Sequence, residues 1–95
     1  MNKMHNQLNI RVFGEVQGVW FRKSVKEEAI RIGITGLVMN EPDGSVFIIA
    51  KGLDQQLEEF ISYCKHGPDL AKVKNVHIKE DEEVNEYDGF QIIRD

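Results

Sequence analysis

The sequence predicts one α+β domain, in which an antiparallel sheet carries two helices on one face. Short segments alternate apolar and polar residues, as half-buried strands do, whereas two longer segments repeat apolar residues at three- and four-residue steps, as amphipathic helices do. These segments follow one another as strand, helix, strand, strand, helix, strand. Because right-handed crossovers bring both helices to one face of the sheet, this order favours a ferredoxin-like βαββαβ sandwich.

The first predicted strand stops at Gly14, and its apolar members are Leu8, Ile10 and Val12. The helix after it stops at Gly33, and its apolar residues are Phe21, Val25, Ala29 and Ile32. We expect residues 1–7 to be a frayed or disordered tail and residues 8–95 to form the single domain.

A hairpin is predicted next, from a strand at 34–40, a Pro and Asp-Gly turn at 41–44 and a strand at 45–51. Asp54 is the expected cap of the second helix, which closes at Gly67 and Pro68. In the strand at 71–79, Val73 is out of phase with the apolar residues that follow, which predicts a bulge or a bend. The acidic segment 80–86 is expected to be a solvated loop, and Phe90, Ile92 and Ile93 supply a short closing strand.

Composition narrows the classes of function. The 95 residues suffice for one domain, and a net charge of −4 argues against sequence-independent binding of nucleic acid. Cys64 is the only cysteine, which excludes an intrachain disulfide, and there is neither a signal-peptide core nor an apolar run near the about 20 residues of a membrane span. We therefore expect a cytoplasmic monomer that contacts no membrane.

The segment 14–22 joins the first strand to the first helix. Gly14 and Gly18 allow its backbone N–H groups to turn toward one point, where the helix dipole adds partial positive charge and Arg22 can grip two phosphate oxygens. Glycine spacing alone favours a plain strand-to-helix turn with Arg22 exposed. The segment has neither the Gly-Lys-Ser/Thr ending of a nucleotide P-loop nor a nucleophilic cysteine.

Asn40 is the second candidate site residue. In the predicted fold the first two strands run parallel with one strand between them, so Gly14 and Asn40 leave the same edge of the sheet on the order of 10 Å apart. A small substrate fits that gap. Taken alone, Asn40 also fits a turn-initiating residue before Pro42.

Two long motifs occur in order, GEVQGVWFR at residues 14–22 and GLVMNEPDGSV at residues 36–46. They closely resemble the two signature segments of the acylphosphatase family, and the likeness extends to Gly67, Pro68, Phe90 and Ile92. The resemblance implies a hydrolase that needs no metal or other cofactor and converts small acyl phosphates to carboxylate and inorganic phosphate on a ferredoxin-like scaffold.

The resemblance also implies roles for single residues. Arg22 matches the family's phosphate-binding arginine, and Asn40 matches the asparagine that orients the attacking water. The backbone that surrounds the phosphate is matched by Glu15, Val16, Gln17, Gly18, Val19, Trp20 and Phe21. The chemistry agrees, because an amide can both donate to and accept from a water, and an acyl phosphate has a good leaving group, so positioning and charge stabilisation can suffice.

Several positions depart from the family pattern. Leu37 stands where an aromatic residue is usual, and Arg94 and Asp95 end the chain where an aromatic residue commonly closes the last strand. We expect these changes to affect packing or stability rather than chemistry. Trp20 replaces a residue that is often smaller, and it either shapes the mouth of the pocket or packs in the core.

Other interpretations remain open. A non-catalytic phosphate- or anion-binding regulatory module could keep the same fold, although it would have no use for a water-orienting Asn40. Binding of single-stranded RNA would need stacking residues in basic surroundings; Phe13 and Phe47 are available, but basic surroundings are not evident. The three histidines are far apart in sequence, which makes a metal site improbable, and Cys64 is expected to serve packing.

Overall fold

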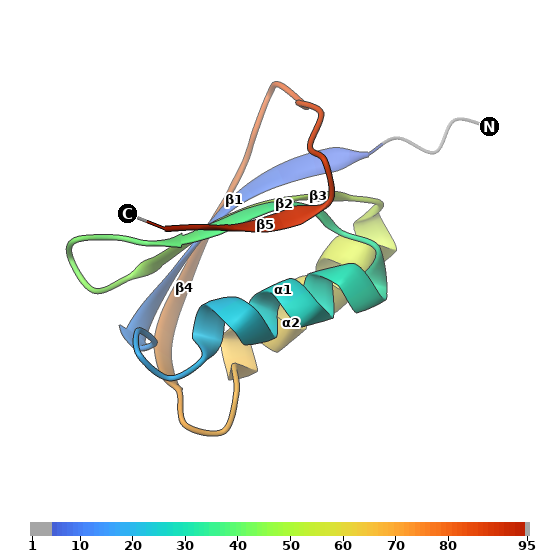
Figure 1. Ribbon diagram of the computed structural model, residues 1–95. Coiled ribbons are helices and arrows are strands. Elements are labelled where there is room, and N and C mark those ends of the chain that lie inside the picture. Colours follow the sequence, from blue (N-terminus) through green and yellow to red (C-terminus); the bar gives the residue numbers. More distant parts are fainter. Residues whose placement is uncertain (1–4, 95) are drawn as a thin grey trace.

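The computed structural model describes residues 5–94, which form a five-stranded sheet with two helices on one face (Figure 1). In chain order the elements are β1 (Asn6–Glu15), α1 (Phe21–Ile32), β2 (Thr35–Asn40), β3 (Val46–Gly52), α2 (Asp54–His66), β4 (Lys72–Glu80) and β5 (Phe90–Ile93). The strands lie in the order β4-β1-β3-β2-β5. The predicted ferredoxin-like α+β fold is therefore confirmed. No helix among the described residues has the length and apolar character needed to cross a membrane.

The prediction of a purely antiparallel sheet is wrong for one strand pair. β5 runs parallel to β2, whereas the other three neighbouring pairs are antiparallel. β4 and β5 lie at opposite edges of the sheet, and the segment between them carries the chain from one edge to the other (Figure 1). Because the chain enters β5 from the end of the sheet where β4 finishes, β5 takes the direction of β2.

The first strand begins earlier than predicted. Asn6 pairs with Gly52 and Gln7 with Lys51, so the predicted tail of residues 1–7 is too long by these two residues; residues 1–4 lie outside the described part. Gln7 is buried because the segment after β4 folds over it. Its side-chain amide donates to Oδ2 of Asp81 at 2.7 Å, and its Oε1 accepts the backbone N–H of Asn85 at 2.8 Å. The acidic loop is thus tied to the sheet at these points.

The two helices stop at the predicted glycines, but the start of the second one differs. α1 ends at Ile32, and its C-cap Gly33 has a left-handed backbone and donates its N–H to the carbonyl oxygen of Ala29. In α2 the cap is Leu53, and Asp54, which was expected to be the cap, is the first helical residue. The Asp54 carboxylate accepts a hydrogen bond from Asn6 instead. Asn6 is the first residue of β1, so the early start of this strand places a hydrogen-bond donor beside Asp54.

The predicted bulge in β4 is confirmed. Phe13 pairs with Asn75 and Gly14 pairs with Val73, which leaves Lys74 as the extra residue. Gly14 has φ 131°, and a Cβ there would lie 2.1 Å from a backbone oxygen of β4. Only glycine fits this close approach, which occurs where β1 gives way to the loop before α1.

The apolar core lies between the helices and the sheet. Its fully buried side chains come from the sheet at Ile10, Val12, Val38, Val46 and Ile48, and from the helices at Phe21, Val25, Phe60 and Cys64. The expected packing role of the cysteine agrees with this burial, and removal from water raises the pKa of the Cys64 thiol to about 12.

Candidate active site

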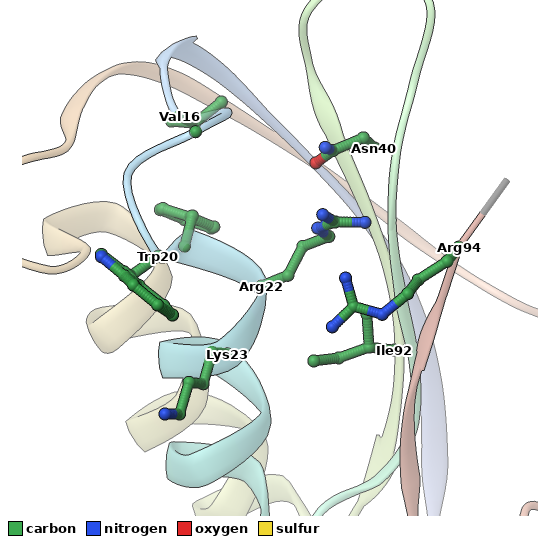
Figure 2. Close-up of a pocket in the computed structure, with 9 residues that line it drawn as sticks. Val16, Trp20, Arg22, Lys23, Asn40, Ile92 and Arg94 are labelled. Atoms are coloured by element: carbon green, nitrogen blue, oxygen red, sulfur yellow. The ribbon is translucent and has the colours of Figure 1, made fainter.

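The register of the sheet brings the two candidate segments together at the end of the sheet where β1 and β2 finish. Val46 of β3 pairs with Val12 of β1 on one side and with Asn40 of β2 on the other. The loop that leaves β1 and the end of β2 are therefore separated by a single strand, as predicted. A pocket of about 370 Å³ opens there, lined by Val16, Gly18, Trp20, Phe21, Arg22, Lys23, Asn40, Ile92 and Arg94 (Figure 2).

The loop before α1 has the properties of an anion site. Gly18 and Trp20 adopt left-handed backbone conformations, with φ 74° and 65°, and Trp20 is the one non-glycine residue among 5–94 with positive φ. Within those residues, no backbone N–H group of 16–20 donates a hydrogen bond to another protein group. Such a strained turn with free donors is a common feature of ligand-binding loops.

The start of α1 reinforces this property. No side chain caps the helix, and its first turn holds no acidic residue but does hold Arg22 and Lys23. Cations at a helix N-terminus oppose the helix dipole, so this arrangement costs local stability. A bound anion would satisfy the free backbone N–H groups and the charge of Arg22 together, whereas the Lys23 ammonium group lies beside the Trp20 ring.

Arg22 and Asn40 face the same space from different elements. Figure 2 shows the guanidinium of Arg22 extending from α1 into the pocket and the carboxamide of Asn40 pointing toward it from the end of β2. No carboxylate among residues 5–94 forms a salt bridge with Arg22. The Oδ1 atom of Asn40 is buried and has no hydrogen-bond partner in the described protein. A buried acceptor without a partner costs about 1–3 kcal/mol, which a bound water or ligand would offset.

Of the predicted phosphate-contacting residues, three do not line the pocket. Glu15 is exposed and pairs with Lys72 at the end of β1, and Val19 packs against the core. Gln17 turns its side chain toward the β2–β3 hairpin. The loop can thus serve a phosphate only through the backbone at these three positions.

Trp20 lies at the mouth of the pocket and not in the core. Trp20 is 70% exposed, and its side chain points away from Arg22 and Asn40 (Figure 2). The Nζ atom of Lys23 lies 5.3 Å from the centre of the Trp20 ring. The alternative in which Trp20 packs in the core is therefore wrong.

Sequence reasoning missed three residues of the pocket, namely Lys23, Ile92 and Arg94. Arg94, which was expected to affect packing or stability, is exposed, and its guanidinium lies in the pocket (Figure 2). The parallel pairing of β5 with β2 places it there. The one available signal was the two-residue step between Ile92 and Arg94, which puts both on one face of a strand.

No group of three or more His, Cys, Asp or Glu side chains that could hold a metal ion exists in the part of the chain that the structure describes. The pocket instead offers backbone N–H groups, one carboxamide and the guanidinium groups of Arg22 and Arg94 (Figure 2). These features define a ferredoxin-like α+β domain with a pocket for a small anion at the end of the sheet where β1 and β2 finish.

Known proteins identify the family of this domain. Residues 8–92 match the family model described as acylphosphatase. An acylphosphatase of Thiobacillus denitrificans is 44% identical over 84 residues, covering 88% of this chain and 92% of the relative, and one of Methylococcus capsulatus is 36% identical over 94% and 97%. The crystal structure of acylphosphatase from Bacillus subtilis superposes with a TM-score of 0.91 at 35% identity, covering 96% of this chain and all of that one. The chain belongs to the acylphosphatase family, whose members are enzymes that hydrolyse acyl phosphates.

Proposed function

We propose that this acylphosphatase cleaves the carboxyl-phosphate bond of small acyl phosphates by direct attack of water. Arg22 and the backbone of the loop 15–21 hold the phosphate, and Asn40 orients the water. The observation that carries this assignment is the unpartnered, buried Oδ1 of Asn40 in the same pocket as the guanidinium of Arg22.

The proposed reaction needs no protein nucleophile. Oδ1 of Asn40 accepts one hydrogen of the water, which directs a lone pair of the water oxygen toward phosphorus. A bond from that oxygen to phosphorus forms as the bond from phosphorus to the acyl oxygen breaks, and the carboxylate leaves with its electron pair. A phosphate oxygen takes the proton of the water. Arg22 and the free N–H groups stabilise charge on the phosphoryl oxygens.

We further propose that the enzyme is a cytoplasmic monomer that uses no cofactor and acts on no nucleic acid. The single cysteine fits a reducing compartment, and the net charge of −4 opposes binding to a polyanion. Light scattering on the purified protein measures the oligomeric state directly. A dimer at micromolar concentration would contradict the monomer.

The test of the mechanism separates binding from chemistry on the same folded samples. Asn40→Ala should bind inorganic phosphate in calorimetry nearly as wild type does, while hydrolysis of benzoyl phosphate falls about 10²- to 10³-fold, the usual cost of losing one positioned polar group. Asn85→Ala, an exposed position in the acidic loop, is the matched control and should keep full turnover. Turnover of Asn40→Ala within a few-fold of wild type would leave Asn40 as a turn residue only. Loss of binding as well would place it among the phosphate-binding groups.

A comparison of substrates addresses the alternative of a non-catalytic binding module. The wild-type protein should release phosphate from benzoyl phosphate and be much slower on an ordinary phosphate ester, because an alkoxide is a poorer leaving group than a carboxylate. Phosphate binding without release from either compound would favour the binding module.

A further inference from the structure

Arg94 occupies a position beside Asn40 that follows from the sheet. β5 and β2 pair in parallel with Met39 opposite Ile93, so the next residues along the two strands, Asn40 and Arg94, are neighbours across the pair. Adjacent strands are about 4.8 Å apart. Arg94 therefore leaves the sheet next to the residue proposed to orient the water.

The side chains of these two neighbours lie on the same face of the sheet. Alternate residues of a strand share a face, and Val38 and Ile92, two residues earlier, both pack in the core beneath the helices. This is the face from which α1 presents Arg22. Figure 2 shows the guanidinium of Arg94 extending from β5 toward that of Arg22 in the space that Asn40 also faces.

This arrangement gathers positive charge in one pocket. Arg22, Lys23 and Arg94 line it, and none of the nine lining residues is acidic, although the chain as a whole carries a net charge of −4. Figure 2 shows the Lys23 ammonium group directed away from this space, beside the Trp20 ring, so Arg22 and Arg94 are the two cations that face it. Like charges repel one another, and an anion with more than one negative charge between the two guanidinium groups makes their approach favourable.

We infer that Arg94 is a second phosphate-binding residue, which acts with Arg22 on the doubly charged phosphoryl group. The inference rests on the phosphate site proposed above. In an in-line displacement the attacking water and the leaving acyl oxygen lie on opposite sides of phosphorus. A group beside Asn40 is on the water's side, so it contacts phosphoryl oxygens and not the acyl group. Arg94 should therefore affect all acyl phosphates alike.

The test measures the binding of inorganic phosphate by calorimetry, at one pH below and one pH above the second pKa of phosphate. Arg94→Gln should weaken binding of the dianion about tenfold, the lower end of what a hydrogen bond to a charged group contributes, and weaken binding of the monoanion less. Arg94→Lys keeps a cation and should restore part of the loss. Lys79→Gln removes the same charge from an exposed position on β4, at the opposite edge of the sheet, and should bind as wild type does.

The outcomes separate this inference from the proposed phosphate site. Equal affinity of Arg94→Gln and wild type for the dianion would overturn the role of Arg94, and so would an equal loss in Lys79→Gln, which would indicate a long-range charge effect. If Arg22→Lys weakens binding and Arg94→Gln does not, only the inference about Arg94 fails. If Arg22→Lys binds phosphate as tightly as wild type, the phosphate site itself is wrong.

Discussion

The side-chain nitrogen of Gln17 lies 2.8 Å from the carbonyl oxygen of Glu41, the residue that follows Asn40. The same nitrogen donates to the carbonyl oxygen of Ser45 at 2.9 Å. One amide thus joins the loop proposed to bind the phosphate to the hairpin that carries Asn40. We expect Gln17 to act as a positioning residue, because its two hydrogen bonds link the two halves of the proposed site.

Gln17→Glu tests that link with almost no change in shape. The substitution replaces two N–H donors by a carboxylate oxygen that faces two carbonyl oxygens. We expect the free energy of unfolding to fall by about 1–3 kcal/mol. We also expect kcat for benzoyl phosphate to fall about 10²-fold, since displacements near 1 Å cost that much. Gln55→Glu, an exposed position in α2, is the control and should match wild type. Full activity in a folded Gln17→Glu protein would show that the loop is positioned without this link.

Arg22→Lys should not behave as a conservative substitution. An ammonium group cannot reproduce the planar pair of donors that a guanidinium offers to two phosphate oxygens. We expect the affinity for inorganic phosphate and the turnover of benzoyl phosphate both to fall about tenfold or more, the equivalent of one charge-assisted hydrogen bond. Competitive inhibition by phosphate is the measurement. Inhibition at wild-type strength would remove Arg22 from the binding site.

Activity should survive strong chelation. The proposed reaction uses N–H groups, Arg22 and Asn40, and none of its steps requires a metal ion. Turnover of benzoyl phosphate should therefore be the same before and after dialysis against EDTA. A loss that a divalent cation restores would contradict the metal-free mechanism.

Cys64→Ser should preserve turnover while it lowers stability. The cysteine is buried in the core away from the pocket, and a serine hydroxyl there without a partner costs about 1–3 kcal/mol. Denaturant unfolding and benzoyl phosphate hydrolysis on the same sample check both expectations. A folded but inactive variant would show that the thiol takes part in the reaction.

The same thiol predicts how stability depends on pH. Burial raises the pKa of Cys64 from 9.0 to about 12, so the unfolded chain ionises first as pH rises. Below pH 9 the thiol is neutral in both states and adds no pH dependence to stability. Between pH 9 and about 12 the free energy of unfolding of wild type should fall by up to about 1.4 kcal/mol per pH unit relative to that of Cys64→Ser, which has no thiol. If the free energy of unfolding changed with pH in the same way in both proteins over that range, the raised pKa of Cys64 would be contradicted.

The local patterns of the sequence determined most of the fold and the two proposed site residues. Periodicity marked each helix and strand, the out-of-phase Val73 marked the bulge, and the motifs around Arg22 and Asn40 marked the segments that meet at one sheet edge. These features are readable because each depends on residues that are close together in the chain, or on a crossover rule that any such order of elements obeys.

Only the tertiary structure decided how distant segments pair. The parallel pairing of β5 with β2 placed Arg94 beside Asn40, the fold of the acidic loop buried Gln7, and the hairpin carbonyls engaged Gln17. A four-residue strand pairs almost equally well in either direction by its own pattern. Its partner and direction depend instead on where the preceding loop delivers the chain, which is a property of the whole fold and not of the residues in the strand.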